Sequence, residues 1–411
     1  MSISPARRAA FEVVRRVFED DAYADRALGR AVAGLEGRDR ALAQRLAYGT
    51  VQRARTLDHA IEMLGKRPVR KLDAPVLAAL RLGAYQIGFL DSIPAHAAVD
   101  ESVELVRAAG LQRAVPFTNA VLRRVAEGIA PLLAALPETA PEEAALKHSY
   151  PDWVAETWWR ELGGDEAIAL MRAQNEPAER VVRVNRRLRA EVDGRPDAEL
   201  PDALHVDRVE EQAVASGLVW PQSRASQLAG LVVGSRKGER TLDLCAAPGG
   251  KATQLAGEVV AVEKHPARAR ELEENRRRMG ADNVQVVRGD ALELPDELTG
   301  FDRALVDAPC SGLGVLASRP DLRWRARPLP ELQLALLRVA AERVRPGGTL
   351  VYAVCTINAE ENEGVVDASD LTVETLADEW PRYRHPRRPE FLLTLPHRHG
   401  TSGFFIARLR P

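Results

Sequence analysis

The sequence has few cysteines, no long apolar run and almost no net charge. Its 411 residues include only Cys245, Cys310 and Cys355, which are odd in number, lie far apart and lack the spacing of metal ligands. We therefore expect reduced thiols, no disulfide framework and no metal site. No apolar run reaches the roughly 18 residues of a membrane span, and residues 1–10 lack the regions of a signal peptide. These absences predict a cytoplasmic protein without a membrane segment.

The near-zero net charge conceals a difference along the chain. Residues 1–135 carry 20 Lys and Arg against 15 Asp and Glu, whereas the remainder carries 37 against 44. A basic module joined to an acidic one is compatible with nucleic-acid binding, although ordinary surface charge explains the counts equally well. At 411 residues the chain is too long for one average core, so we expect two or three domains.

The first 135 residues predict an all-helical domain. Ser4-Pro5 is a typical helix start, because Ser can cap the helix and Pro suits its first turn. Apolar residues then recur at helical spacing, as Ala10 and Val14 do, and again Leu80 and Ala84. Several helices of this kind can bury their apolar stripes against one another and form a compact core.

The residues that follow predict a linker and a small α/β module. Two prolines among small residues at 136–150 predict the linker. Residues 180–189 alternate apolar and basic side chains, as a strand with one wet face does, and five of these ten residues are arginine. Such a module suits single-stranded RNA, whereas a basic edge strand also protects a sheet from pairing with another chain. Both interpretations stay open, and we favour RNA.

From residue 239 onward the pattern alternates strand and helix, which is typical of a parallel sheet covered on both faces. The expected strands are residues 241–245, 259–263, 284–287, 301–307 and 349–354, with late strands near 391–395 and 403–409. The first strand ends in small residues at 246–250, and a helical pattern with Lys251 follows. A strand, a glycine turn and a helix form a corner where a ligand can approach the backbone.

Acidic residues stand at the carboxyl ends of the next three expected strands. Glu263 is placed to accept hydrogen bonds from ribose hydroxyls, Asp290 suits an adenine amino group, and Asp307 ends the following strand. One such residue can simply cap a helix, but three beside the glycine corner favour a ligand. The sequence lacks the Gly-x-Gly-x-x-Gly and P-loop patterns of dinucleotide and triphosphate sites. S-adenosyl-L-methionine, a nucleoside with a charged amino-acid tail and no phosphate, fits these features.

Several motifs carry a family resemblance. They are residues 242–251 (LDLCAAPGGK), 307–312 (DAPCSG), 355–357 (CTI), 360–363 (EENE) and 403–405 (GFF). Together they resemble the RNA (cytosine-5)-methyltransferase superfamily. The front of the chain resembles the NusB-like RNA-binding fold at residues 80–87, 93–99 and 117–123. With both parts, nearly the whole sequence is similar to the bacterial small-subunit ribosomal RNA methyltransferase B (Sun/Fmu) family.

This resemblance implies a multidomain architecture and a reaction. An all-α NusB-like domain would occupy residues 1–135, a linker and small α/β RRM-like module 136–235, and a Rossmann-like class I methyltransferase domain 236–411. The implied function is S-adenosyl-L-methionine-dependent methylation of C5 of one cytosine in small-subunit (16S) ribosomal RNA, through a covalent adduct between a cysteine and C6. The implied partner is ribosomal RNA, and we expect a monomer.

The reaction explains why cysteines are needed. Cytosine C5 is a poor nucleophile until a thiolate adds to C6, and loss of the C5 proton after methylation expels the thiol. Asp307 suits the acid that stabilises the adduct near N3. This chemistry does not rank Cys310 and Cys355, but the resemblance makes Cys355 the nucleophile and gives Cys310 the release of the product. The resemblance also directs Lys251 toward the cofactor or Asp307 and adds Arg268 as a candidate.

The predicted catalytic residues are therefore Cys355, Cys310 and Asp307. The predicted cofactor-binding residues are Cys245, Ala246, Ala247, Pro248, Gly249, Gly250, Lys251, Glu263, Arg268, Asp290 and Asp307. We expect Cys245 to be a buried strand residue. Two other functions stay open: the same catalysis on another RNA such as transfer RNA, and a non-catalytic RNA-binding or assembly factor. The two thiols of the active-site motifs disfavour the second, which has no chemical need of them.

Overall fold

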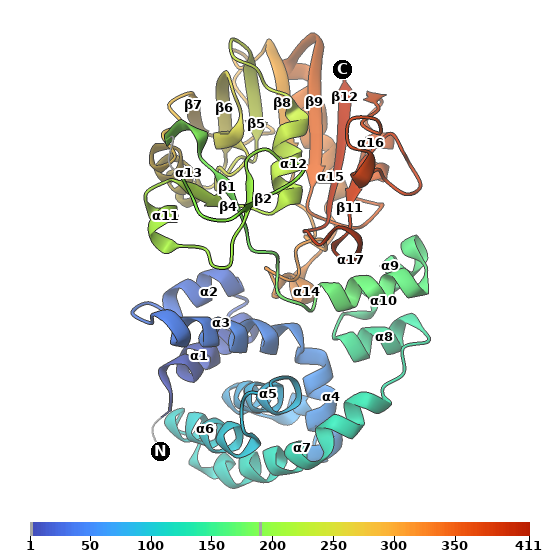
Figure 1. Ribbon diagram of the computed structural model, residues 1–411. Helices are drawn as coiled ribbons and strands as arrows, with labels where there is room; N and C mark the ends of the chain where they lie inside the picture. Colours follow the sequence, from blue (N-terminus) through green and yellow to red (C-terminus); the bar gives the residue numbers. More distant parts are fainter. Residues whose placement is uncertain (1–2, 189–190) are drawn as a thin grey trace. The chain divides into compact units, whose positions relative to one another are not determined.

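The computed structural model describes residues 3–188 and 191–411 and groups them into two compact units (Figure 1). The helical unit contains the described residues up to Glu176 together with Leu316–Arg325, and the sheet unit contains those of Pro177–Val315 and Ala326–Pro411. The division of the chain into three domains stays a prediction. None of the helices in the described ranges combines the length and the apolar character that a membrane span requires.

The helical unit confirms the prediction for the front of the chain. Proline stands in the first turn of α1, α5 and α7, where its fixed φ and missing N–H suit a helix start. The helices are α1 Pro5–Glu19, α2 Ala24–Ala31, α3 Gly37–Gln52, α4 Ala54–Gly65, α5 Ala74–Phe89, α6 Ala95–Ala108, α7 Val115–Ala135, α8 Pro141–His148, α9 Asp152–Leu162, α10 Gly164–Ala173 and α14 Leu322–Arg325.

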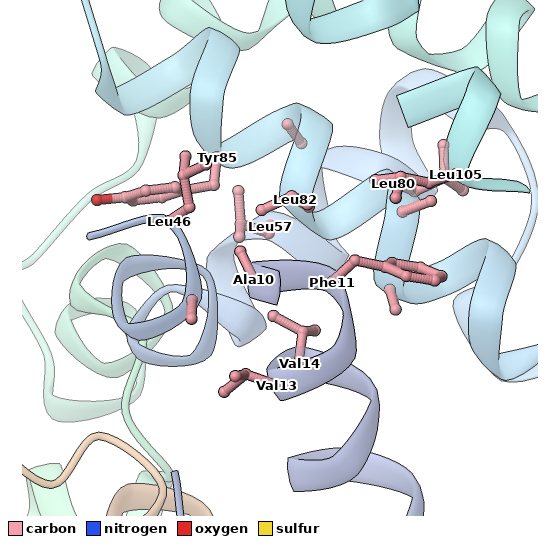
Figure 2. Close-up of a cluster of buried hydrophobic side chains, with 14 of the residues drawn as sticks. Ala10, Phe11, Val13, Val14, Leu46, Leu57, Leu80, Leu82, Tyr85 and Leu105 are labelled. Carbon is pink, nitrogen blue, oxygen red and sulfur yellow. The ribbon is translucent and has the colours of Figure 1, made fainter. Parts of the chain in front are cut away.

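The apolar stripes of these helices form one core. Ala10, Val14 and Leu80, whose spacing predicted an inner helix face, are fully buried. Figure 2 shows side chains of α1, α3, α4 and α5 meeting in this cluster, with Leu46 from α3 and Leu57 from α4 among them. The helical period of the sequence was therefore sufficient to find the core of this unit.

The segment predicted as a linker carries helix α8. Pro141 begins the helix, and the Glu143 carboxylate caps its start by accepting the backbone N–H of Thr139 at 2.9 Å and of Ala140 at 3.2 Å. In the last turn of α8, the Leu146 carbonyl oxygen accepts a hydrogen bond from the Thr56 hydroxyl of α4 at 2.6 Å. A short helix with its own cap and a tertiary partner therefore lies within the segment predicted as a linker.

The segment Leu316–Arg325 comes from the C-terminal half of the sequence but packs within the helical unit. Its centre is Arg323, which is fully buried and lies 4.0 Å from the Tyr150 ring centroid. The guanidinium donates to the carbonyl oxygens of Gln52, Ser149 and Gln174, to Asn175 Oδ1 and to the Tyr150 hydroxyl, at 2.8–3.3 Å. The neighbouring Trp324 Nε1 donates to the Val51 carbonyl oxygen at 2.7 Å. Burial lowers the pKa of Arg323 to about 10, so it remains charged at neutral pH.

The sheet unit contains a small antiparallel sheet and a large mixed sheet. The small sheet has the order β2-β3-β1-β4, with β1 Val181–Val184, β2 Arg195–Pro196, β3 Ala203–His205 and β4 Val219–Pro221. The large sheet contains β5 Arg240–Leu244, β6 Glu258–Glu263, β7 Val284–Arg288, β8 Phe301–Asp307, β9 Val344–Val354, β10 Thr372–Glu374, β11 Leu392–Thr394 and β12 Phe404–Arg410. The helices of the sheet unit are α11 Glu211–Ala215, α12 Arg224–Val233, α13 Pro266–Arg278, α15 Pro330–Arg343, α16 Glu363–Asp367 and α17 Pro396–His399.

The large sheet has the strand order β10-β12-β9-β8-β5-β6-β7, with β11 paired to β12. Strands β5 to β9 pair in parallel, whereas β12 lies antiparallel to β9. Helix α12 packs on β8, β9 and β12, in front of the sheet in Figure 1. The five predicted parallel strands are confirmed. Since β5 pairs with β6 on one side and β8 on the other, the chain reverses its order at β5, where open α/β sheets bind ligands.

Candidate active site

The corner after β5 is built from small residues with special backbone conformations. Cys245 follows the strand rather than lying in it, is half-buried and has φ +65°, so the expected buried strand position is wrong. Gly249 has φ +107°, a conformation that favours glycine. A Cβ on Gly250 would lie 2.8 Å from Trp220 Nε1, so this position has no space for a side chain.

The helix predicted after the glycine turn is also wrong. The chain forms only the short 3₁₀ turn Ala252–Gln254, and Leu255 is already extended. The reason is the short connection, because β6 begins at Glu258 and Gly257 must turn the chain with φ +69°. Because the described chain forms only this short turn after the corner, the groups that a ligand there would meet are those of the loop backbone itself.

Side chains of α13 hold this loop from one side. Arg268 Nη2 donates to the Ala247 carbonyl oxygen at 2.8 Å, and Asn275 Nδ2 donates to the Pro248 carbonyl oxygen at 2.9 Å. Arg268 Nε also lies 3.5 Å from a carboxylate oxygen of Glu263. Arg268 thus links the loop to β6, and its contact with a cofactor stays a prediction.

Two arginines of the predicted RNA-binding strand hold the loop from the other side. Arg183, only 3% exposed, donates to the Gly250 carbonyl oxygen at 3.1 Å and to Thr253 Oγ1 at 2.8 Å. Arg187 donates to the Thr253 carbonyl oxygen at 2.6 Å. Burial lowers the pKa of Arg183 to about 10. Two arginines of the basic stretch, the buried Arg183 and the exposed Arg187, therefore bind the loop backbone, whereas the prediction favoured RNA for this stretch. Its last arginine, Arg189, lies outside the described residues.

The acidic residues at the strand ends have different surroundings. Glu263 is 3% exposed, and one of its carboxylate oxygens accepts the His265 backbone N–H at 2.8 Å. Asp290 is more open and lies 2.5 Å from Lys264 Nζ, and this hydrogen bond lowers the pKa of Asp290. Ribose and adenine contacts for these two residues stay predictions.

A further acid, Asp243, was missed by sequence reasoning. It lies within β5, is 1% exposed, and neither of its carboxylate oxygens has a hydrogen-bond partner in the described chain. Burial raises its pKa well above the usual range, which favours the neutral acid at neutral pH. The sequence signal that could have identified Asp243 is an acidic residue placed directly between Leu242 and Leu244 in a predicted buried strand.

Lys251, in the loop after β5, and Asp307, at the end of the neighbouring strand β8, form an ion pair. Lys251 Nζ lies 2.6 Å from Asp307 Oδ2, and it also lies 5.0 Å from the Phe404 ring centroid. Of the two directions expected for Lys251, the structure shows the one toward Asp307. The pair joins the glycine corner after β5 to the end of β8.

The two predicted catalytic cysteines are neighbours. Cys310 Sγ and Cys355 Sγ lie 3.4 Å apart. Their proximity follows from topology, because Cys310 follows β8, Cys355 follows β9, and these strands pair in parallel up to Asp307 and Ala353. Hydrogen bonding to Cys355 and burial raise the pKa of Cys310 well above its usual value.

The terminal motif at 403–405 supports Cys355 through the backbone. The Gly403 N–H donates to the Gly314 carbonyl oxygen at 2.8 Å, and the Gly314 N–H donates to the Cys355 carbonyl oxygen at 3.0 Å. A Cβ on Gly403 would lie 2.5 Å from Ile357 Cδ1. The close approach explains why glycine occupies position 403, whose only signal in the sequence was its place in a family motif.

Comparisons with known proteins match both units. A model of the NusB family matches residues 4–127, and a model described as 16S rRNA methyltransferase RsmB/F matches residues 231–410. The ribosomal RNA small subunit methyltransferase B of Thermus thermophilus is 37% identical, with 94% of this chain and 92% of the relative covered. A probable ribosomal RNA small subunit methyltransferase B of Synechocystis is 34% identical, with 98% and 99% covered. The chain belongs to the RsmB/F family of rRNA methyltransferases.

Solved structures agree with this RsmB/F assignment. The crystal structure of a protein designated PH0851 is 26% identical, covers 100% of both chains and has a TM-score of 0.81. A methyltransferase homologue from Pyrococcus horikoshii is 27% identical, with 66% of this chain and 99% of that chain covered and a TM-score of 0.55. As an RsmB/F methyltransferase, the chain uses S-adenosyl-L-methionine as its cofactor.

Replacing Gly250 tests the tight fit of the corner after β5 and its predicted role in cofactor binding in this RsmB/F protein. We expect Gly250→Ala to weaken S-adenosyl-L-methionine binding about tenfold, because its Cβ must displace the loop or Trp220, and such overpacking costs about 1–3 kcal/mol. Isothermal calorimetry measures the change. Gly29→Ala is the control, since an added Cβ there meets nothing within 4 Å. A Kd for Gly250→Ala within twofold of the unaltered protein contradicts the prediction.

The third cysteine is expected to react slowly with alkylating reagents. Burial raises the pKa of Cys245 to about 12, so only about one molecule in 10⁴ carries the reactive thiolate at pH 8. Alkylation by iodoacetamide should therefore accelerate about tenfold per pH unit between pH 8 and 10, as measured by mass spectrometry of the peptide containing Cys245. A rate that is already constant above pH 9 contradicts the raised pKa.

Proposed function

We propose that the chain methylates C5 of a cytosine in small-subunit ribosomal RNA through a covalent adduct with Cys355. The observation that carries this proposal is the thiol pair, whose sulfur atoms lie 3.4 Å apart at the ends of two neighbouring parallel strands. Methylation at C5 needs one thiolate to add to C6 and later to leave, and a second thiol beside it can assist that departure. The names of the relatives support ribosomal RNA as the substrate.

The residues around the glycine corner fit S-adenosyl-L-methionine. Glu263 offers a carboxylate at the end of β6 for ribose hydroxyls, Asp290 offers one after β7 for the adenine amino group, and the small residues of the loop leave the backbone approachable. When bound, the cofactor supplies an electrophilic methyl group. These residue roles are part of our proposal.

Cys355 and Asp307 perform the first step of the proposed reaction. The Cys355 thiolate forms a bond to C6 of the cytosine, and the electron pair of the C5=C6 bond shifts through C4 to N3. N3 takes a proton there, for which Asp307 is the donor. Lys251, 2.6 Å from Asp307, supplies that proton through the carboxylate. C5 then has the electron density of an enamine carbon and accepts the methyl group.

Cys310 acts in the proposed second step. Loss of the C5 proton restores the C5=C6 bond, and the electron pair of the C6–S bond leaves with the Cys355 sulfur. Water accepts the C5 proton, N3 returns its proton to Asp307, and the neutral Cys310 thiol beside the departing sulfur donates a hydrogen bond that stabilises it as the thiolate. The two thiols thus have separate tasks, addition for Cys355 and release for Cys310.

The helical unit offers a surface for the RNA. Arg67, Lys71, Arg113 and Phe117 line a cavity of about 500 Å³, and the Arg67 guanidinium lies 5.3 Å from the Phe117 ring centroid. Cations beside an aromatic ring suit phosphates and unstacked bases. The target base itself must be unpaired or flipped, since C6 is unreachable in a stacked helix. A cytoplasmic location follows from this substrate and stays a prediction.

The test is methyl transfer from labelled S-adenosyl-L-methionine to unmodified small-subunit rRNA, followed by nucleoside analysis. We expect label in 5-methylcytidine at one position, and no label in transfer RNA under the same conditions. RNA with 5-fluorocytidine at that position should give a protein-RNA band on a denaturing gel, because fluorine prevents the loss of the C5 proton. Label in another nucleoside, or no label at all, overturns the proposal.

A further inference from the structure

A buried carboxylate, Glu361, links the two loops that carry the catalytic cysteines. It is fully buried on the loop after β9. Its Oε1 accepts the Ser311 backbone N–H at 2.9 Å, Gln333 Nε2 at 2.9 Å and the Leu329 backbone N–H at 3.1 Å. Its Oε2 accepts the Ser311 hydroxyl and Asn358 Nδ2, the latter at 3.4 Å. Five neutral donors from three segments, at residues 311, 329–333 and 358, therefore converge on one side chain.

These contacts reach the residue that follows each cysteine. Ser311 follows Cys310, and its hydroxyl also lies 2.7 Å from the hydroxyl of Thr356, which follows Cys355. Gln333, on α15, donates to both Glu361 and the carbonyl oxygen of Pro309, the residue before Cys310, the second bond at 2.8 Å. The Tyr352 hydroxyl donates to the Glu361 carbonyl oxygen at 2.7 Å, which ties the loop to β9.

We propose that Glu361 is a positioning residue that fixes the distance and orientation of the Cys310 and Cys355 thiols. This positioning role rests on the proposed function, and it belongs to a residue that touches no reacting atom. An ionised carboxylate accepts at both oxygens and donates nothing, so it can satisfy all five donors at once. The amide of a glutamine would place its NH₂ group, which only donates, against partners that are also donors. Glu361 also contributes, after Cys355 and burial, to the raised pKa of Cys310.

The variant Glu361→Gln keeps the shape and removes one acceptor, so it tests this role. We expect kcat for methyl transfer to fall about 10²-fold, as a displacement of about 1 Å at reacting atoms can cause, while the Kd for S-adenosyl-L-methionine stays within twofold. Ser311→Ala removes the hydroxyl that joins Glu361 to Thr356 but keeps the backbone N–H donor at position 311, and it should lower kcat about tenfold. Glu342→Gln makes the same chemical change at an exposed position of α15 and should leave kcat unchanged.

A second readout does not depend on catalysis. Diamide oxidises two adjacent thiols to a disulfide and is itself reduced to the hydrazine, so Cys310 and Cys355, with sulfurs 3.4 Å apart, should be cross-linked rapidly. We expect Glu361→Gln and Ser311→Ala to slow this reaction at least fivefold, as measured by mass spectrometry. If both variants keep the oxidation rate and kcat of the unaltered protein within twofold, the positioning role is wrong. Slower oxidation in the variants of a protein that methylates no cytosine would instead support the positioning role and overturn the proposed function.

Discussion

Replacing Cys355 with alanine is expected to abolish methyl transfer to rRNA, with a fall of at least about 10⁴-fold in kcat, as for the loss of other catalytic nucleophiles. The alanine side chain cannot add to C6, so C5 never becomes nucleophilic. The measurement is incorporation of labelled methyl groups under saturating rRNA and cofactor. The Kd for S-adenosyl-L-methionine should stay within about twofold, which shows that the fold is intact.

The companion variant Cys310→Ala separates the tasks of the two thiols. It should still form the bond between Cys355 and C6 but release the product slowly, so a covalent protein-RNA adduct accumulates on a denaturing gel. The double variant Cys310→Ala/Cys355→Ala should form no adduct. If Cys355→Ala still methylates while Cys310→Ala does not, the nucleophile is Cys310 and our assignment is reversed.

Loss of Arg323 is expected to produce a large stability defect in the helical unit. Arg323→Ala leaves a cavity and removes the donors of five buried acceptors, and an unsatisfied buried polar group costs about 1–3 kcal/mol. Since such costs are not additive, we expect the helical unit to lose about 4 kcal/mol of unfolding free energy, which corresponds to a fall of about 10 °C in Tm for a unit of this size. Differential scanning calorimetry measures the transition.

Arg325→Ala provides the matched control within the same segment. Arg325 pairs with Asp21 at 3.1 Å near the surface, where an ion pair contributes only about 0–1 kcal/mol. The two arginines are two positions apart and differ chiefly in burial. Equal losses from the two variants would show that the segment, and not the buried guanidinium, determines the stability.

The parallel strands were predictable from sequence because each is a short apolar run that ends at a turn. Residues 301–307 were predicted as a strand, and β8 spans Phe301–Asp307. The helix after the glycine turn was wrongly predicted, because the local pattern contains no information on how soon the chain must enter β6. The proximity of Cys310 and Cys355 follows from the pairing of β8 with β9, since the carboxyl ends of parallel strands meet at one edge of the sheet.

Contacts between distant segments could not be predicted in this way. Arg183 looked like an exposed arginine of a basic strand, but its acceptors lie at Gly250 and Thr253 on another loop. Glu361 was visible in the sequence only as part of a motif, because its proposed role depends on hydrogen bonds from Ser311 and Gln333, which are distant in the chain. Sequence periodicity identifies which face of an element is buried, but not which distant residue completes a polar network.

The position of Arg323 in the chain has a consequence for biosynthesis. Ribosomes deliver the polypeptide from its N-terminus, and domains usually fold in that order as they emerge. The helical unit, however, is completed by Leu316–Arg325, which is synthesised after most of the sheet unit's parallel strands. Until that segment emerges, the carbonyl groups of Gln52, Ser149 and Gln174 lack their buried donor. The first part of this protein to be translated therefore reaches its final state only when more than three quarters of the chain has been made.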